Sequence, residues 1–247
     1  MTISDVEVAR RAAQAAADVL LRLRDAGNLT GRPLGDAGDA AAQQAIVASL
    51  TADRPEDVVF SEEAADDPRR LTADRVWIVD PLDGTREYGE PGRHDWAVHV
   101  ALWSAGDLTA AAVALPGLGE MLLTDPAPAL PPRSDGRVRV AVSRSRPPAE
   151  AAAVATLLDA ELVPLGSAGY KTVAVARGEV DAYVHSGGQY QWDSAAPVAI
   201  ARAAGLTTVR LDGSPLVYND RDPWLPDLVV CRPELADRIL DAAVPAA

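Results

Sequence analysis

The sequence has very little cysteine and lysine, and it contains no long hydrophobic run. The single cysteine, Cys231, excludes a disulfide within the chain and is typical of a reducing cytoplasm, where we expect this protein. No apolar stretch approaches the length that crosses a membrane, and the first residues lack a basic segment followed by an apolar one. We therefore expect neither a membrane anchor nor a secretory signal. Lys171 is the only lysine, so arginine carries nearly all the positive charge.

Positive charge is scarce as a whole, because 23 basic residues face 36 acidic ones and the formal net charge is −13. Nonspecific binding to nucleic acid needs a basic surface, so this class of function is excluded. A small phosphorylated ligand is still compatible with the composition, since bound metal ions can supply local positive charge. The 247 residues are enough for one large domain or two small ones.

The predicted elements divide the chain into two halves. The first half begins with a helix from the capping box at Ser4 to about Asp25, followed by a Gly-rich loop from Gly27 to Gly38 and a helix from Ala40 to Leu50. Strands are predicted at 58–60, 76–79, 96–103, 108–115 and 120–124, the last three as an antiparallel meander. A Pro-rich stretch at 125–136 marks the boundary between an α+β half, residues 1–130, and an α/β half, residues 131–247.

Strands and helices alternate in the second half, which favours an α/β arrangement. Strands are predicted at 138–142, 162–165, 180–184, 207–211 and 228–231. Helices are predicted at 149–160, 169–177, 194–204 and 233–244.

Residues 76–85 combine a buried strand with two carboxylates. Pro81 has no N–H to donate, so we expect the apolar strand to end before it. Asp80 and Asp83 then lie close together and repel each other unless a cation such as Mg²⁺ lies between them or one is protonated. Gly84 and Thr85 can begin a helix whose free N–H groups attract a phosphate. The alternative is an ordinary turn, for which this composition is equally suitable.

Other acidic residues can join this pair. Glu62 follows the strand at 58–60, and adjacent strands could bring it to the same rim as Asp80 and Asp83; the alternative is a solvated surface residue. Asp39 and Asp193 each precede a predicted helix, where the alternative is simple N-capping. If Asp193 meets Asp80 and Asp83 across the two halves, a binuclear metal site forms at their interface.

Three motifs together resemble a known family. Glu62-Glu63, the run from Asp80 to Thr85 and the run from Trp192 to Pro197 resemble, in order and spacing, the motifs of the inositol monophosphatase superfamily. Its members are Mg²⁺-dependent, lithium-sensitive phosphomonoesterases. Arg86-Glu87-Tyr88 is similar to the CysQ branch, which hydrolyses 3′-phosphoadenosine 5′-phosphate, and residues 61–103 and 166–232 resemble actinobacterial CysQ proteins. The resemblance implies an α-β-α-β-α sandwich of the inositol monophosphatase and fructose-1,6-bisphosphatase type.

The resemblance also implies a metal site with two to three Mg²⁺ ions. Glu62, Asp80 and the carbonyl of Leu82 would bind the first ion, and Asp80, Asp83 and Asp193 the second. Glu62 would also contact a third, weaker ion. The catalytic residues would be Glu62 together with Thr85, which Asp39 orients so that it positions the attacking water. Asp36 is a rival to Asp39 for this role.

Substrate contacts are implied at both ends of the site. The N–H groups of Gly84 and Thr85 would hold the phosphate, and Lys171 resembles a lysine that contacts the second phosphate of the nucleotide; the alternative is an exposed helix lysine. The remaining expected substrate contacts are Glu62, Leu82, Asp83, Ser167 and Asp193.

Several basic and histidine side chains have undecided or structural roles. Arg144 and Arg146 are either further anion contacts or parts of a solvated loop. His185 lies near the adenine or caps a strand, and we favour the cap. His94 and His99 lack a metal-ligand context, and we expect His99 in the core.

These residues predict a phosphatase that converts 3′-phosphoadenosine 5′-phosphate to AMP and phosphate by attack of metal-activated water. The alternatives within the superfamily are an inositol 1-phosphate or fructose 1,6-bisphosphate phosphatase, or an enzyme with both kinds of activity. Alternatives of other classes are a nonhydrolytic metal- or nucleotide-binding protein and a structural domain whose aspartates are caps and turns. The resemblance further implies a homodimer.

Overall fold

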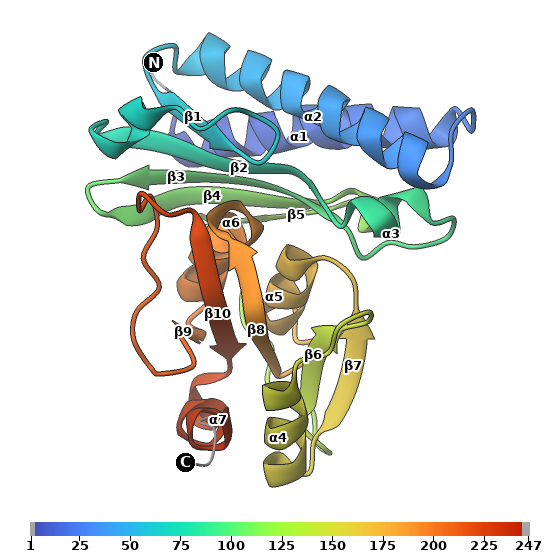
Figure 1. Cartoon of the computed structure of the whole chain (residues 1–247), viewed down its shortest axis with the longest axis vertical. Helices are drawn as coiled ribbons and strands as arrows, with labels where there is room; N and C mark the ends of the chain where they lie inside the picture. The colour runs from blue at the N-terminus through green and yellow to red at the C-terminus, as the bar shows by residue number, and fades with distance from the viewer. Residues whose placement is uncertain (1–2, 244–247) are drawn as a thin grey trace.

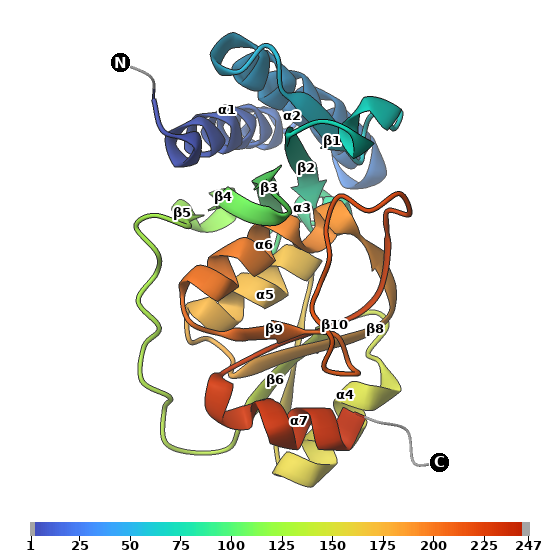
Figure 2. The ribbon, with the colours of Figure 1, turned by 90° about the vertical axis from the view of Figure 1, so that its left-hand side faces the viewer.

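The computed structural model describes residues 3–243 as five stacked layers (Figures 1 and 2). Helices α1 (Asp5–Asp25) and α2 (Gly31–Asp53) form the first layer and cover a five-stranded sheet. Helices α5 (Ala168–Ala176) and α6 (Gln191–Ala203) separate this sheet from a second one, whose far face is covered by α4 (Ala149–Leu158) and α7 (Ala236–Ala243). The predicted α-β-α-β-α sandwich is confirmed.

The first sheet brings two strand ends to one edge. Its order is β1-β2-β3-β4-β5. The strands are β1 (Val58–Ser61), β2 (Arg75–Asp83), β3 (Ala97–Ser104), β4 (Asp107–Leu115) and β5 (Glu120–Leu123). Strands β1 and β2 are parallel, with Ser61 opposite Val79, whereas β3, β4 and β5 form the predicted antiparallel meander. Because β1 ends opposite Val79 and runs parallel to β2, Glu62 and Asp80 follow this last pair at the same rim.

The second sheet has the order β7-β6-β8-β10-β9. Its strands are β6 (Arg139–Ser143), β7 (Glu161–Leu165), β8 (Ala182–Tyr190), β9 (Thr207–Val209) and β10 (Trp224–Cys231). Short helices also occur at α3 (Thr85–Gly89), η1 (Pro68–Leu71), η2 (Pro116–Leu118) and η3 (Pro233–Leu235). The alternation of strands and helices predicted for this half is confirmed.

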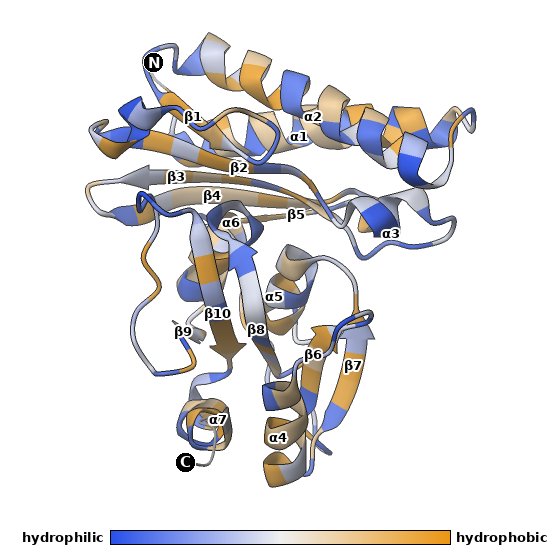
Figure 3. Cartoon of the chain, viewed as in Figure 1, coloured by the Kyte–Doolittle hydropathy of each residue, from blue (hydrophilic) through white to orange (hydrophobic). Residues whose placement is uncertain are grey.

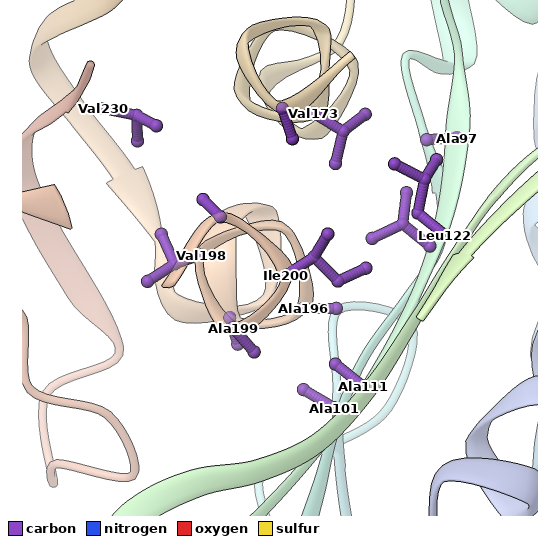
Figure 4. Packing of buried hydrophobic residues seen from close by; sticks show 14 of the residues in the cluster. Ala97, Ala101, Ala111, Leu122, Val173, Ala196, Val198, Ala199, Ile200 and Val230 are labelled. Atoms are coloured by element: carbon purple, nitrogen blue, oxygen red, sulfur yellow. The ribbon is translucent and has the colours of Figure 1, made fainter. Parts of the chain in front are cut away.

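The largest hydrophobic cluster lies between the two sheets. Small side chains on the first sheet, Ala97, Ala101 and Ala111, let α6 approach closely enough for Ala196 and Ile200 to pack there (Figure 4). Separate clusters lie beneath α1 and α2, which alternate between hydrophobic and hydrophilic residues along their length (Figure 3), and beneath α4 and α7. Burial on this scale is the main favourable term in folding.

The linker between the halves is the stretch 124–138, which contains no helix or strand. It runs along the outside of the molecule from β5 to β6 (Figure 2). The central cluster draws residues from both sides of it, for example Ala97 and Ile200. The division at residue 130 therefore stays a prediction about the chain. No helix among residues 3–243 is long and apolar enough to cross a membrane.

The predicted loop from Gly27 to Gly38 is correct only for residues 27–30, because α2 begins at Gly31. Gly35 and Gly38 lie inside this helix and are used for close packing instead of a turn. A Cβ atom at Gly35 would lie 2.5 Å from Cγ2 of Thr85, and one at Gly38 would lie 2.8 Å from Cε1 of Tyr88. The absence of side chains at these two positions lets α2 lie directly against α3.

The predicted end of the strand before Pro81 is also wrong, since β2 continues to Asp83. Strand β1 ends opposite Val79, so Pro81 has no neighbour there that would need its N–H. On the other side the register with β3 is interrupted between Asp80 and Asp83, which accommodates the proline as a bulge. The last predicted helix, 233–244, is the turn η3 followed by α7; Val244 lies outside the described residues.

Candidate active site

Asp80 is fully buried at the rim of the first sheet and is incompletely paired. Its Oδ1 accepts a hydrogen bond from the N–H of Leu82 at 3.0 Å, whereas Oδ2 has no partner among the described residues. Burial raises the pKa of Asp80 well above its ordinary value, and the charges of Glu62, Asp83 and Asp193 raise it further. We call these four carboxylates the cluster, since their charges act on one another, and ligand atoms of Asp83 and His99 lie within 4.8 Å of those of Asp80.

Asp83 ties the first sheet to the second half of the chain. Its carboxylate accepts hydrogen bonds from Ser167 Oγ at 2.5 Å, from the N–H of Ala168 at 3.2 Å and from the N–H of Gly169 at 2.6 Å. All three donors lie at the N-terminus of α5, where the helix dipole favours a negative charge. Ser167 has φ 47°, an unusual backbone conformation for a residue other than glycine.

Asp193 does not cap its helix as predicted, because α6 begins at Gln191 and its N-cap is Tyr190. Asp193 is the third helical residue, and its Oδ2 accepts the N–H of Tyr190 at 2.5 Å. It thus completes the helix end from inside the first turn, as in a capping box. Burial and the charge of Asp83 raise its pKa, so the carboxylate also belongs to the cluster.

Glu62 joins the cluster from the end of β1, where its N–H donates to the carbonyl of Val79 at 3.4 Å. The residue as a whole is exposed. Even so, desolvation of its carboxylate and then the charges of Asp193 and Asp83 raise its pKa. Glu62 is thus exposed, as the solvated-surface alternative predicted, while the charges of Asp193 and Asp83 act on its carboxylate.

His99 lies beside the carboxylates, a position that the sequence did not predict. It is fully buried in β3, as expected. However, the expected lack of a metal-ligand context is wrong, because ligand atoms of Asp80, Asp83 and His99 lie within 4.8 Å of one another. Nδ1 lies 3.2 Å from the carbonyl oxygen of Trp192, and Nε2 lies 3.5 Å from Oδ2 of Asp83. No motif in the sequence marks a lone histidine on a strand in this way.

Asp39 lies within α2, so the N-cap interpretation is wrong; Thr30 is the N-cap. Oγ1 of Thr85 lies 3.4 Å from Oδ1 of Asp39 and 3.1 Å from the carbonyl oxygen of Leu82. Burial and the charge of Glu63 raise the pKa of Asp39 to about 7. Asp36, the rival residue, is exposed and lies 3.8 Å from Arg32.

A pocket of about 760 Å³ adjoins the cluster. Gly84 and Thr85 line it, and Gly84 is the N-cap of α3 with φ 89°, a conformation that glycine adopts without strain. Asp83 and Asp193 reach its wall from opposite halves of the chain. A phosphate in this pocket could therefore contact both the predicted cradle and the carboxylates.

The second half supplies most of the positive charge of the pocket, to which the first half adds Arg86. Lys171 is buried, which excludes the exposed-lysine alternative, and Nζ donates to the carbonyl oxygens of Gly166 at 3.1 Å and Ser167 at 2.5 Å. Burial lowers the pKa of Lys171 to about 8, although the charges of Asp83 and Glu87 oppose this shift. The Lys171 ammonium group is thus held at the pocket by two neutral carbonyl oxygens, and these do not neutralise its charge.

The two arginines of the loop after β6 make different contacts. Arg144 donates to Glu87 at 2.5 Å and to Glu90 at 2.6 Å, so it joins α3 to the second half. Arg146 lines the pocket and is exposed. His185 also lines the pocket, where Nε2 lies 3.0 Å from the carbonyl oxygen of Gly188.

The residues of the cluster fit a divalent metal ion. Three observations agree: Oδ2 of Asp80 is buried without a hydrogen-bond partner, ligand atoms of Asp80, Asp83 and His99 converge within 4.8 Å, and every predicted ligand offers oxygen. Divalent cations such as Mg²⁺ prefer carboxylate and carbonyl oxygen. Burial, followed by neighbouring carboxylates, raises the pKa values of Glu62, Asp80 and Asp193, so these groups would be costly to keep ionised without a cation.

The sequence is similar to that of several characterised proteins. It is 52% identical to a protein of Mycobacterium bovis named 3′-phosphoadenosine 5′-phosphate phosphatase. The 217 aligned residues cover 85% of this chain and 81% of the relative. A Mycobacterium leprae protein of the same name is 47% identical over 251 residues, 96% of this chain and 93% of the relative. The 3′(2′),5′-bisphosphate nucleotidase CysQ of Escherichia coli is 31% identical over 204 residues, 76% and 81% of the two chains.

The fold has known counterparts as well. The structure of CysQ from Bacteroides thetaiotaomicron, a bacterial member of the inositol monophosphatase family, matches with a TM-score of 0.80 and 26% identity over 92% of this chain and 97% of that one. The model of the inositol monophosphatase family matches residues 1–245. This chain therefore belongs to the inositol monophosphatase family.

Proposed function

We propose that this protein is a Mg²⁺-dependent phosphatase that hydrolyses 3′-phosphoadenosine 5′-phosphate to AMP and phosphate. The observation that carries the proposal is the fully buried Asp80 beside a pocket lined by Lys171: its Oδ2 has no hydrogen-bond partner among the described residues, and its ligand atoms lie within 4.8 Å of those of Asp83 and His99. The choice of nucleotide is supported by the names of the relatives at 52% and 47% identity.

In this proposal Glu62, Asp80 and Asp83, together with Asp193 and the carbonyl of Leu82, hold two to three Mg²⁺ ions. When bound, the ions supply a water of lowered pKa and stabilise the oxygen that leaves. The fit rests on the unpartnered oxygen of Asp80 and on carboxylate and carbonyl donors, which Mg²⁺ prefers.

Asp39 and Thr85 position the attacking water. The Thr85 hydroxyl has a single proton, which it can donate to Asp39 or to the carbonyl of Leu82. When Asp39 is ionised and accepts the hydrogen bond from the Thr85 hydroxyl, the Thr85 oxygen is free to accept a hydrogen bond from water. The exposed Asp36 lacks any such link to Thr85, which supports Asp39 for the role.

The remaining residues bind and orient the substrate. The N–H groups of Gly84 and Thr85 at the start of α3 hold the phosphate that is cleaved. Ser167 fixes Asp83 through its hydroxyl, and Lys171 lies across the pocket where it can contact the second phosphate. Arg146, exposed on the same wall, can add a further contact to this phosphate.

A substrate panel tests the proposal. Phosphate release is measured from 3′-phosphoadenosine 5′-phosphate, inositol 1-phosphate and fructose 1,6-bisphosphate at one Mg²⁺ concentration, with a chelator control. We expect the nucleotide to have the highest kcat/KM and the chelator to abolish turnover. Faster turnover of inositol 1-phosphate would instead make the protein an inositol phosphatase.

Asp193→Asn separates an enzyme from a nonhydrolytic binding protein on the same fold. We expect it to lower kcat/KM by roughly 100-fold or more while the protein stays folded, because one charged ligand is lost. Turnover equal to that of the unaltered protein would remove Asp193 from the site. We further propose a cytoplasmic homodimer, and light scattering of the purified protein tests the dimer.

A further inference from the structure

Gln189 is a polar side chain of the pocket that the mechanism leaves without a role. It lies near the end of β8 and lines the same pocket as Asp83 and Lys171. The residue is 6% exposed, and among the described residues neither Oε1 nor Nε2 has a hydrogen-bond partner. Buried amides with both ends unpaired are rare in native proteins and call for an explanation. Gln189 therefore needs a partner that the chain itself does not provide.

The chemistry of the amide restricts that partner. Oε1 accepts hydrogen bonds and Nε2 donates them, so a complete partner must present a donor beside an acceptor. Phosphate oxygens only accept and would satisfy one end. Adenine presents its N6 amino group beside the acceptors N1 and N7, and glutamine pairs with N6 and N7 when proteins read adenine in DNA. A polyol could also pair both ends, so the surroundings must decide.

The surroundings of Gln189 are aromatic. Trp224 and Tyr190 line the pocket and are 44% and 43% exposed, with their rings in an edge-to-face contact at 5.4 Å. Tyr190 in turn stacks on Trp192 at 4.8 Å, which holds its ring in place. Exposed aromatic faces of this kind suit a flat base, which stacks on them, and offer little to a polyol.

The backbone beside Gln189 leaves room for the Trp224 ring. A Cβ atom at Gly188 would lie 1.6 Å from Cζ2 of Trp224, so the indole packs directly on the glycine. The His185 ring contacts the carbonyl oxygen of Gly188 at 3.0 Å and fixes the segment. The amide atoms of Gln189 are buried. The exposed side chain of Trp224, which packs on the neighbouring Gly188, can change rotamer and so give a ligand access to this amide without opening the core.

We propose that Gln189 reads the adenine base of the substrate while Trp224 and Tyr190 form the surface on which the base stacks. This inference rests on the proposed nucleotide phosphatase function and adds a base-specific subsite to it. The carboxylates and the cradle at Thr85 act on the phosphate, whereas Gln189 distinguishes one base from another.

The test compares two substrates that differ only in the base. One is 3′-phosphoadenosine 5′-phosphate, and the other is 1-O-methyl ribose 3,5-bisphosphate, in which a methoxy group replaces adenine. We expect Gln189→Ala to lower kcat/KM for the nucleotide by roughly 10- to 100-fold, mainly through KM, because both hydrogen bonds are lost. Turnover of the base-free compound should change by less than about twofold, which also shows that the variant is folded.

A second variant separates hydrogen bonding from shape. Gln189→Met keeps the approximate size and adds no charge but neither donates nor accepts strong hydrogen bonds, so we expect the same selective loss for the nucleotide. Trp224→Ala should lower nucleotide turnover by roughly 5- to 100-fold through lost stacking. Leu157→Ala is the matched control and should change nothing, because Leu157 is an exposed hydrophobic residue of α4 that does not line this pocket.

The possible failures are distinguishable. Equal effects of Gln189→Ala on both substrates, or none on either, would overturn the base-reading role while the phosphatase function stands. A loss seen only with inositol 1-phosphate would make Gln189 a polyol contact and would overturn the inference. If the unaltered protein hydrolyses the base-free compound but not the nucleotide, the proposed function itself fails and the inference falls with it.

Discussion

Asp80 in the first sheet and Asp181 beside the second sheet are both fully buried, but their surroundings are opposite. Asp181 accepts the N–H of Arg139 at 2.9 Å, and the guanidinium groups of Arg139 and Arg232 lie 3.7 and 3.3 Å from its oxygens. Asp80 has no such cation. Each aspartate has one oxygen without a hydrogen bond among the described residues, Oδ2 of Asp80 and Oδ1 of Asp181. Beside Oδ1 of Asp181 lies the Arg232 guanidinium, whereas beside Oδ2 of Asp80 lies His99 at 3.9 Å, whose pKa is lowered by burial, and the charges of Glu62, Asp83 and Asp193 add to the negative potential.

The difference separates a structural carboxylate from a functional one. Keeping a buried carboxylate ionised is costly unless positive charge lies nearby. Around Asp181 the chain provides that charge itself, so the residue serves folding. Around Asp80 the chain adds negative charge instead, which is tolerable only when a cation comes from solution or a proton is taken up. The two aspartates should therefore respond in opposite ways to the same substitution.

Asp80→Asn should give the largest loss of activity. The amide keeps the size of the side chain but removes the charge shared by the proposed metal site, so we expect kcat/KM to fall by roughly 1,000-fold or more. In the presence of a chelator the variant should be more stable than the unaltered protein, because repulsion with Glu62 and Asp83 is relieved. Activity assays and urea unfolding with chelator measure the two effects.

Asp181→Asn should show the reverse pattern. It leaves the buried Arg232 without its partner charge, and breaking such a pair typically costs about 3–5 kcal/mol of the free energy of unfolding. The activity of the folded fraction should stay within about twofold, since Asp181 does not line the pocket. If both variants lost stability in chelator and both kept activity, the proposed contrast between the two carboxylates would be wrong.

The Asp80 side of this contrast is visible in the sequence, whereas nothing in the sequence marks Asp181. The strand endings at Glu62 and Asp80 and the motif with Asp83 predicted one rim, because parallel strands end on the same edge. The layered fold followed from the resemblance and from the order of the elements. The position of Asp193 at the third residue of α6 was out of reach, because helix ends shift by a turn without any change in pattern.

The features that sequence reasoning missed depend on contacts between distant residues. Gly35 and Gly38 were interpreted as loop residues, yet Thr85 and Tyr88 pack against them inside a helix. His99 belongs to no motif, and only the pairing of β3 with β2, which places it opposite Asp80, brings it to Asp83. Tertiary contacts of this kind override local propensity, and no single segment records them.

Addition of Mg²⁺ should sharpen the comparison further. A ligand that binds only the folded state stabilises it by about 2.7 kcal/mol at 100 times its Kd. We expect a gain of this order for the unaltered protein and for Asp181→Asn, and none for Asp80→Asn, in thermal unfolding with and without Mg²⁺. An equal gain in Asp80→Asn would place the bound ion elsewhere.

The smallest expected effect is a pH dependence without metal, to which Asp39 contributes. Its pKa rises from 3.8 to about 7 on folding, mainly through burial, so between these values the folded state binds more protons than the unfolded state. Stability must then fall as pH rises from about 4 to about 7, with a slope below about 1.4 kcal/mol per pH unit for each proton. Because Asp39 is only half-buried, its own share should be well under this bound.

Asp39→Asn should flatten part of that slope in urea unfolding with chelator, whereas the exposed Asp36→Asn, its matched control, should leave the slope unchanged. Saturating Mg²⁺ should reverse the trend in the unaltered protein, because bound cations favour the ionised carboxylates and make protonation compete with binding. A metal-free protein that gains stability as pH rises would mean that its carboxylates are already balanced by positive charge. Asp80 would then resemble Asp181, and the distinction between the two sheets would disappear.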